Sequence, residues 1–196
     1  MTLEPTPDPL LLIDQWREQA RAAGSRIPEA ATLATVDQDG APRARVVLVR
    51  SRTARAFHFF TNYESDKALE LAAEPRAALC IHHVELGVQA RIEGRATRLS
   101  ASASDEYFRS RPRLSQLGAW ASEQSRPLSS RDELEARLQE VTARFAGADV
   151  PRPANWGGYG LEADRVELWV DRAGRLHERT KFSFVDGAWR SQLLWP

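Results

Sequence analysis

Short strand-like segments joined by tight turns occur on both sides of a long helical stretch. This pattern constrains the fold more than any other feature of the chain. Hairpin turns are predicted at 37–40, at 171–174 and at 186–187, where Asp and Gly recur. The sequence nowhere alternates strand with helix, as a parallel sheet requires. We therefore expect a mainly antiparallel β protein of the α+β class, with a barrel-like sheet and peripheral helices.

The expected strands are short and are distributed along most of the chain. One of them contains Gly94, which predicts a bend or bulge because glycine packs nothing and tolerates unusual backbone geometry. The strands are predicted at 32–36, 44–50, 56–61, 76–82, 88–99, 158–161, 165–170, 176–184 and 188–194.

Helices are predicted from their start and stop signals. Asp8 is expected to cap a first helix that has Pro9 at its first position, and Ser65 is expected to cap a short helix over 66–73. A helical insert is expected at about 102–146, with a capping box formed by Ser130 and Glu133. We expect a single domain over 1–196, with residues 1–7 as a flexible tail.

The charge balance and the cysteine content limit the classes of function. Lys plus Arg and Asp plus Glu both number 27, so bulk charge does not favour nucleic acid or an anionic membrane as a partner. Cys80 is the single cysteine, which excludes an intrachain disulfide and suits a reducing compartment. The first residues lack the features of a signal peptide, and no apolar run has the length of a membrane span. We expect a cytoplasmic protein.

Several chemistries are not predicted by the residue pattern. His82 and His83 are adjacent on an expected strand, so their side chains point to opposite faces and cannot share a metal ion. No Cys or His spacing suits zinc, and we expect no metal site. Cys80 lies in an apolar run and is expected to be buried. We find no dinucleotide fingerprint, phosphate loop or serine nucleophile elbow.

Residues 107–125 combine three arginines with hydroxyl, amide and aromatic side chains around Pro112. Guanidinium, hydroxyl and amide groups are those that bind a phosphate or a polar heterocycle. The alternative interpretation is a solvated helix–turn–helix whose arginines face water.

This stretch, Tyr-Phe-x-Ser-Arg-Pro-Arg-x-Ser-Gln-x-Gly-Ala-Trp-x-Ser-x-Gln-Ser, resembles a signature of the pyridoxine/pyridoxamine 5'-phosphate oxidase family. The run Arg-Leu-His-Glu-Arg over 175–179 resembles the family's second signature. The similarity extends from about Leu10 to Pro196. The resemblance implies a split β-barrel that binds flavin mononucleotide (FMN) at the interface of a homodimer.

The resemblance also implies a set of FMN-binding positions. Two of them depart from the family pattern: Arg50 stands where lysine is usual, and Asp66 stands where a basic residue is frequent. Without the resemblance, Arg45 and Arg50 could equally be the charged ends of an edge strand. The implied positions are Arg45, Val46, Val47, Leu48, Arg50, Phe60, Thr61, Asp66, Lys67, Gln89, Gln124, Ser125, Trp169 and Arg179.

By the same resemblance, Arg50, Tyr107, Arg111 and Ser115 bind the substrate, the last three through its 5'-phosphate. Arg175 and His177 are implied to lie over the pyridine ring and to be the catalytic pair. On an expected strand over 176–184, Arg175 and His177 would share one face, with Leu176 turned inward. The alternative for His177 is an ordinary strand histidine with satisfied hydrogen bonds.

The implied activity is the oxidation of pyridoxamine and pyridoxine 5'-phosphates by O2, giving pyridoxal 5'-phosphate and H2O2. A hydride would pass from the C4' carbon of the substrate to flavin N5, so the cofactor carries the chemistry and the protein orients the rings. Two alternatives remain open at this point. One is a related flavin oxidase acting on another ring, as in phenazine biosynthesis, and the other is a non-catalytic flavin or pyridoxal phosphate binding protein.

Overall fold

The computed structural model describes residues 8–196, and the expected tail at 1–7 lies outside the described residues. The helices are α1 (Pro9–Ala22), α2 (Asp66–Ala73), α3 (Ala101–Ser110), α4 (Arg113–Ala121) and α5 (Arg131–Arg144), with short 3-10 turns η1 (Val84–Leu86) and η2 (Ala173–Arg175). The strands are β1 (Ala30–Val36), β2 (Pro42–Leu48), β3 (Ser51–Thr53), β4 (Ala56–Asn62), β5 (Arg76–His83), β6 (Val88–Arg98), β7 (Trp156–Val170), β8 (Glu178–Val185) and β9 (Ala188–Leu194). No helix of the described part is long and apolar enough to cross a membrane.

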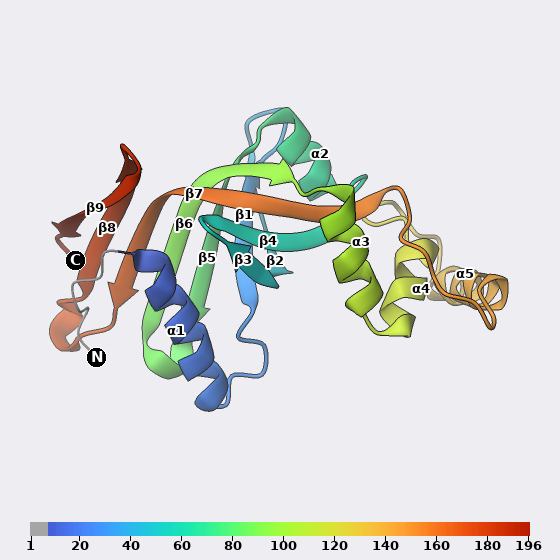
Figure 1. Ribbon diagram of the computed structural model, residues 1–196, viewed down its shortest axis with the longest axis horizontal. Helices are drawn as coiled ribbons and strands as arrows, with labels where there is room; N and C mark the ends of the chain where they lie inside the picture. The colour runs from blue at the N-terminus through green and yellow to red at the C-terminus, as the bar shows by residue number, and fades with distance from the viewer. Residues whose placement is uncertain (1–7) are drawn as a thin grey trace.

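The strands form one curled antiparallel sheet in the order β2-β1-β5-β6-β7-β4-β3, and the β8–β9 hairpin pairs with the second half of β7 (Figure 1). Just after β2, the Arg50 backbone N–H donates to the His58 carbonyl on β4 at 2.9 Å. This bond brings the first strands of the sheet against the last ones. The sheet is therefore curled toward closure, and the expected antiparallel split-barrel architecture is confirmed.

Strand β7 organises the sheet because it pairs with three others. Its first half lies between β6 and β4, and its second half lies between β6 and β8. The sequence predicted two separate strands here, 158–161 and 165–170, with the acidic residues Glu162 and Asp164 between them. That prediction was wrong, because pairing with β6 continues across the interruption. The sequence also missed β3, which has only three residues.

The predicted bulge at Gly94 is confirmed. The register of β6 against β7 shifts between Glu93 and Gly94. A Cβ atom at Gly94 would lie 1.8 Å from the backbone oxygen of Glu162, so no larger residue fits without moving β7.

The helix caps follow the sequence with two differences. Asp8 Oδ1 accepts the Leu10 N–H at 2.9 Å, as predicted for the start of α1. Ser65 precedes α2, but its hydroxyl donates to the Asn62 carbonyl at 2.7 Å and does not cap the helix. Ser130 caps α5, but the Glu133 carboxylate accepts the N–H of Ser129 and not that of Ser130.

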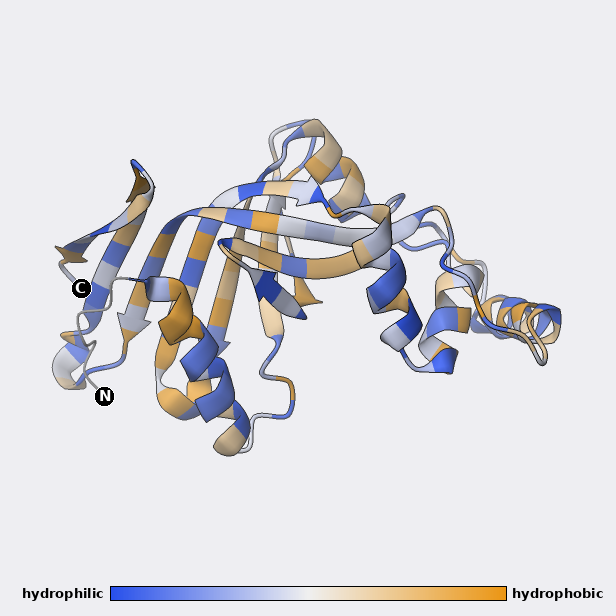
Figure 2. Cartoon of the chain, viewed as in Figure 1, coloured by the Kyte–Doolittle hydropathy of each residue, from blue (hydrophilic) through white to orange (hydrophobic). Residues whose placement is uncertain are grey.

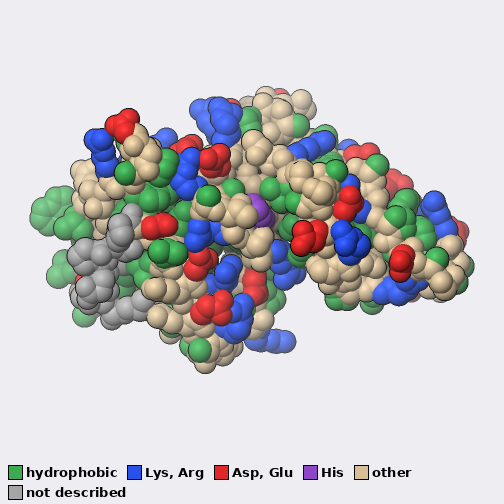
Figure 3. Space-filling view, viewed as in Figure 1, with side chains coloured by type: hydrophobic (Ala, Val, Ile, Leu, Met, Phe, Trp, Pro, Cys, Tyr) green, Lys and Arg blue, Asp and Glu red, His purple; other side chains and the backbone are tan. Residues whose placement is uncertain are grey.

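Two apolar clusters stabilise the molecule. The larger lies between α1 and the curled sheet and includes Trp16, Phe57 and Phe59, and the strands that enclose it alternate hydrophobic with hydrophilic residues (Figure 2). The smaller cluster, around Phe108 and Trp156, packs α3, α4 and α5 against the start of β7. These three helices form an arm beyond the sheet, and charged side chains of both signs are interspersed over the visible face (Figure 3).

Candidate functional site

A cleft of about 330 Å³ lies where the helical arm meets the sheet. Strands β2 and β4 and helices α3 and α4 all contribute to its lining, so residues far apart in the sequence meet here. The cleft is lined by Val46, Val47, Leu48, Arg50, Phe60, Thr61, Asn62, Lys67, Tyr107, Arg111, Ala119, Ser122, Gln124 and Trp156. Ten of these fourteen residues are among the flavin or substrate positions implied by the sequence.

Three aromatic rings make one wall of the cleft. Phe60 on β4 and Tyr107 on α3 stack with their ring centroids 3.8 Å apart and their planes at 19°. The Trp156 ring lies nearly parallel to both, with centroids 5.6 Å from Phe60 and 6.2 Å from Tyr107. Such a wall suits a planar ring or the apolar part of a cation.

Arg111 caps the end of α3 and reaches the same wall. Its guanidinium carbon lies 4.5 Å from the centre of the Trp156 ring. Its Nη1 is buried and has no hydrogen-bond partner among residues 8–196. Burial lowers the pKa of Arg111 below its usual range, because the charged form loses contact with water. A half-buried cation without an anion is unfavourable on its own, and an incoming anion would relieve that cost.

A second cation, Lys67, lies at the start of α2. Its Nζ is 3.2 Å from the hydroxyls of Thr61 and Ser65 and 3.3 Å from Oε1 of Gln124. Burial, together with the nearby Arg45 charge, lowers the pKa of Lys67. In the described part of the chain no carboxylate lies within ion-pair distance of this ammonium group. Lys67 and the positive end of the α2 dipole together favour an anion here.

The segment that follows α4 completes this end of the cleft. Gln124 accepts from the Thr61 hydroxyl at 2.9 Å, and the Ser125 hydroxyl accepts the backbone N–H of Asp66 at 3.2 Å. Ser125 has φ of 70°, which is uncommon for a residue other than glycine and turns the chain back toward α2. Five of the implied flavin positions, Thr61, Asp66, Lys67, Gln124 and Ser125, are therefore neighbours.

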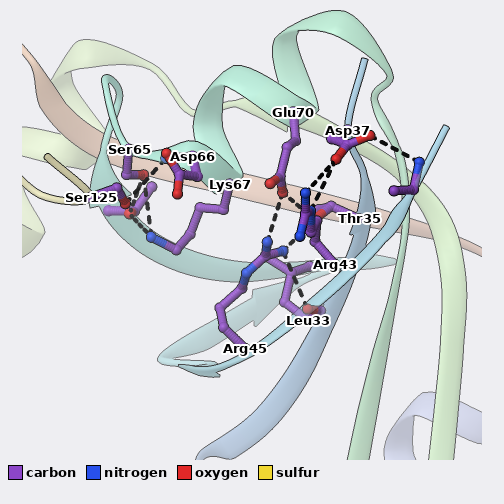
Figure 4. A network of polar contacts seen from close by, with 12 residues as sticks. Leu33, Thr35, Asp37, Arg43, Arg45, Ser65, Asp66, Lys67, Glu70 and Ser125 are labelled. Carbon is purple, nitrogen blue, oxygen red and sulfur yellow. Dashed lines mark hydrogen bonds and ion pairs between the residues drawn. The ribbon is translucent and has the colours of Figure 1, made fainter. Parts of the chain in front are cut away.

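Arg45 does not line this cleft, although the sequence placed it among the flavin ligands. Its Nη2 forms an ion pair with Glu70 on α2 at 2.7 Å, and its Nη1 donates to Thr35 on β1 (Figure 4). Glu70 and Thr35 are both buried. In this structure Arg45 therefore ties β2 to β1 and α2. Val46, Val47, Leu48 and Arg50 continue from it into the cleft.

Gln89, Trp169 and Arg179 form a second group on the β6–β7–β8 part of the sheet. Gln89 is paired with Trp169, and Trp169 with Arg179, across neighbouring strands. Arg179 donates to the Glu167 carboxylate at 2.9 Å and to the Trp195 carbonyl at 2.9 Å. The His177 ring centre lies 4.6 Å from that of Trp169.

The predicted strand geometry of Arg175 and His177 was wrong. Arg175 belongs to η2 and has φ of 61°, and β8 begins only at Glu178. Leu176 is 72% exposed instead of turned inward. The cause is a turn over 171–177, in which Gly174 also has positive φ and the backbone N–H of Arg172 donates to His177 Nδ1 at 3.2 Å. His177 Nδ1 also lies 3.0 Å from the Asp171 carboxylate.

The two groups are separated within one chain. The cleft lies beside α3 and α4 on the right of Figure 1, whereas the turn before β8 lies at the far left. Ser115 on α4 is half-buried and does not line the cleft. One chain therefore brings together the residues around Lys67 and Arg111, but it does not bring Arg175, His177, Trp169 or Arg179 to them.

Trp156 is the main site residue that the sequence analysis missed, together with Asn62, Ala119 and Ser122. A signal was present in Trp-Gly-Gly-Tyr directly after a proline-rich linker. A Cβ atom on Gly157 would lie 2.1 Å from the Tyr63 hydroxyl, and one on Gly158 would lie 2.8 Å from the Phe60 ring. The two glycines therefore allow β7 to pass closely beneath these rings.

The structure also places the adjacent histidines and the single cysteine that the sequence analysis considered. His82 is exposed and His83 is buried, so they point to opposite faces as predicted. Cys80 is only half-buried, and burial raises the pKa of its thiol. Among residues 8–196, no group of three or more His, Cys, Asp or Glu side chains is arranged to hold a metal ion.

Comparison with known proteins agrees with this geometry. Residues 18–145 match the family model for pyridoxamine 5'-phosphate oxidase, and residues 156–196 match that for the pyridoxine 5'-phosphate oxidase C-terminal dimerisation region. The chain belongs to the pyridoxamine 5'-phosphate oxidase family. Pyridoxine/pyridoxamine 5'-phosphate oxidase of Anaeromyxobacter dehalogenans is 50% identical over 198 residues, covering 100% of both chains. The protein of the same name from Myxococcus xanthus is 47% identical over 190 residues, covering 97% of this chain and 92% of that protein.

Solved structures show the same fold. PhzG from Burkholderia lata, in complex with tetrahydrophenazine-1-carboxylic acid, superposes with a TM-score of 0.92 at 32% identity and covers 98% of this chain and 95% of its own. An FMN-binding protein from Nostoc punctiforme related to pyridoxamine 5'-phosphate oxidase superposes with a TM-score of 0.75 at 19% identity, with full coverage of both chains. The family is one of oxidases, and this chain is accordingly an oxidoreductase of that type with a flavin-binding fold.

Proposed function

We propose that this protein is an FMN-dependent oxidase that makes pyridoxal 5'-phosphate, with O2 as acceptor and H2O2 as a product. Pyridoxine 5'-phosphate would lose two hydrogens directly, whereas pyridoxamine 5'-phosphate would also take up water and release its nitrogen as ammonia. The observation that carries the proposal is the pair of cations, Lys67 and Arg111, in one cleft without carboxylate partners among the described residues. A phosphorylated cofactor and a phosphorylated substrate would together occupy two such sites.

The residues around Lys67 fit the phosphate of FMN. Lys67 would supply charge, and the start of α2 and the hydroxyls of Thr61 and Ser125 would supply hydrogen bonds. Val46, Val47 and Leu48, on the open edge of the sheet, would run along the flavin with Phe60. Arg45 would act indirectly by fixing β2 to α2 through Glu70.

The residues around Arg111 fit the substrate phosphate. Tyr107, Arg111 and Arg50 line the cleft, and Ser115 on α4 would join them when the substrate is bound. Arg175 and His177 would hold the pyridine ring in position, so their task is orientation. Bound flavin would supply the redox chemistry by accepting a hydride and passing the electrons to O2.

The separation of the two residue groups supports a homodimer with two equivalent sites. Gln89, Trp169, Arg175, His177 and Arg179 would reach the cleft of a second copy of the chain. The match of residues 156–196 to a dimerisation region supports this arrangement, because these residues include the whole second group except Gln89. An exposed apolar surface at Leu176, Leu193 and Trp195 is suited to such a contact.

The likeness to PhzG favours one second candidate, a flavin oxidase that acts on a reduced phenazine carboxylic acid. Its carboxylate could also bind Arg111. Against this, the Tyr107, Arg111 and Ser115 set is the one that the sequence resemblance assigns to a 5'-phosphate. A non-catalytic flavin or pyridoxal phosphate binding protein is the third candidate.

An oxygen electrode separates the three. Flavin-loaded protein is mixed in turn with pyridoxamine 5'-phosphate, pyridoxine 5'-phosphate and tetrahydrophenazine-1-carboxylic acid, each against a control without protein. We expect O2 uptake and H2O2 formation with the first two. O2 uptake with the phenazine compound and with neither vitamin phosphate would favour the second candidate. Binding of flavin or pyridoxal phosphate without any O2 uptake would favour the third.

A further inference from the structure

Trp156 begins β7 at the base of the cleft and is only 6% exposed. Its backbone is fixed on both sides: its N–H donates to the Pro153 carbonyl at 3.1 Å, and its carbonyl accepts from Arg152 at 2.6 Å. Arg152 in turn forms an ion pair with Asp105 on α3 at 2.6 Å. The indole is therefore held rigidly between the linker that precedes β7 and the helix that carries Tyr107 and Arg111.

The Arg111 guanidinium lies over this indole. The distance from its carbon to the ring centre is 4.5 Å, against 5.5 Å to the Phe108 ring. Within the described residues, Arg111 has no ion-pair partner, and its Nη1 is buried and unbonded. The face of the indole is thus the nearer of the two ring contacts of this cation. It leaves the donor groups of the guanidinium available to an anion.

We propose that Trp156 is a positioning residue of the phosphate site: its indole face fixes the Arg111 guanidinium so that the donors of Arg111 point to an incoming phosphate. The proposal rests on the proposed function for the identity of the substrate. It predicts that Trp156 determines how strongly the protein prefers a phosphorylated substrate over its unphosphorylated analogue. Nothing in this role requires Trp156 to touch the substrate.

Trp120 provides a matched comparison in the same apolar cluster. It also has an arginine over its ring, Arg144, at 4.8 Å. Its Nε1 donates to the Pro151 carbonyl at 2.8 Å, and the residue is not part of the cleft wall. Replacing Trp120 removes a similar volume and a similar arginine contact, but it should leave the phosphate site unchanged.

The experiment measures KM for pyridoxamine 5'-phosphate and for pyridoxamine with flavin-loaded parent, Trp156→Leu, Trp156→Phe and Trp120→Leu. We expect Trp156→Leu to raise KM for the phosphorylated substrate roughly five- to thirty-fold, which corresponds to about 1–2 kcal/mol. KM for pyridoxamine and kcat for both substrates should change much less. Trp156→Phe keeps an aromatic face and should show a smaller change in the same direction. Trp120→Leu should leave the ratio of the two KM values unchanged.

Two results would overturn the proposal. One is an equal rise of both KM values, which indicates general loosening of the cleft. The other is that Trp156→Leu raises KM for pyridoxamine 5'-phosphate as much in the Arg111→Ala background as in the parent. Trp156 should have no influence on phosphate binding once Arg111 is absent. If Trp156→Leu does not fold, Trp156→Phe decides, and an unchanged ratio for that variant contradicts the proposal.

Titration with inorganic phosphate separates this proposal from the proposed function. If the parent oxidises no vitamin B6 phosphate but binds inorganic phosphate, and both Arg111→Ala and Trp156→Phe weaken that binding, only the proposed function fails. If Arg111→Ala weakens phosphate binding and Trp156→Phe leaves it unchanged, only the role of Trp156 fails.

Discussion

At the scale of single residues, Arg111 is a half-buried cation with a buried, unbonded Nη1, and the described residues supply it with no anion. We predict that Arg111→Ala raises KM for pyridoxamine 5'-phosphate about ten- to a hundred-fold, since a charge-assisted hydrogen bond contributes about 1.5–3 kcal/mol. FMN affinity should not change. The melting temperature should stay the same or rise, because a half-buried charge without an ion-pair partner is removed.

Arg109→Ala is the control, because Arg109 is an exposed arginine of the same segment. It should alter neither KM nor the melting temperature. If Arg111→Ala uses pyridoxamine 5'-phosphate as well as the parent does, Arg111 does not bind the phosphate.

Lys67 gives a second residue-scale prediction. Lys67→Met should weaken FMN binding roughly ten-fold or more, because its ammonium is proposed to bind the flavin phosphate. Riboflavin, which lacks the phosphate, should bind parent and variant alike. Quenching of flavin fluorescence measures both affinities. Lys181→Met on β8 changes the other lysine of the chain and should alter neither affinity. If Lys67→Met weakens the binding of FMN and of riboflavin equally, Lys67 does not bind the phosphate.

The residue scale also shows where sequence reasoning stops. Motif matching grouped Arg45 with Lys67, but the contact that ties Arg45 to α2 depends on Glu70, twenty-five positions away. Trp156 escaped notice because its importance comes from stacking against Phe60 and Tyr107, which are distant in sequence. The local Trp-Gly-Gly-Tyr pattern indicates a close approach of β7 to other side chains, but it does not tell which rings meet there.

At the scale of elements, most helices and strands followed from periodicity, turns and caps. Two strand predictions failed, each for its own reason. β7 was divided in two because a polar interruption cannot reveal that a neighbouring strand pairs across it. The strand expected to include His177 begins later because Arg175 adopts positive φ, which an arginine gives no reason to expect.

The end of β5 yields a pH prediction. His83 is 4% exposed with its Nε2 unbonded, and burial lowers the pKa of His83 below the ordinary value of about 6.5. The unfolded chain therefore binds more protons than the folded one, so this contribution to stability is present above pH of about 6.5 and is lost as the pH falls through the folded pKa.

Chemical unfolding at a series of pH values tests this. The free energy of unfolding of the parent should decrease between about pH 6.5 and 5, and His83→Gln should make that decrease smaller. His82→Gln, at an exposed neighbouring position, should retain most of the pH dependence of the parent, because burial lowers the pKa of His83 more than the His82 charge does. If the free energy of unfolding of His83→Gln decreases with falling pH as steeply as that of the parent, another group is responsible for the pH dependence.

At the scale of the whole molecule, the two groups of proposed site residues lie apart in one chain, one beside α3 and the other at the turn before β8 (Figure 1). We predict a homodimer in which Arg111 of one subunit and His177 of the other serve the same site. Arg111→Ala and His177→Ala should each be poorly active alone. Co-expressed with different tags, they should recover about one quarter of the parent activity, because half of the dimers are mixed and each mixed dimer has one intact site.

Recovery is the decisive feature of that experiment. Mixed dimers purified through both tags should carry one active site per dimer, whereas each single variant re-purified in the same way serves as the control. No recovery in purified mixed dimers would place both residues in one subunit's site. A monomer by light scattering that still holds one flavin per chain would also contradict the dimeric account.

The overall architecture was predictable because hairpin turns and the helical insert restrict the topology strongly. Assembly was not predictable from turns or periodicity, since these describe one chain. The family resemblance implied the dimer, and the separation of Arg111 from His177 gives it a physical reason.

The central claim is that this cleft brings a vitamin B6 phosphate to a bound flavin for oxidation. The most direct measurement mixes FMN-loaded protein anaerobically with one equivalent of pyridoxamine 5'-phosphate and follows the flavin absorbance. We predict that the yellow colour is lost and that pyridoxal 5'-phosphate forms in equal amount, and that admitting O2 restores the colour with release of H2O2. A flavin that stays oxidised while the substrate is bound would contradict the account.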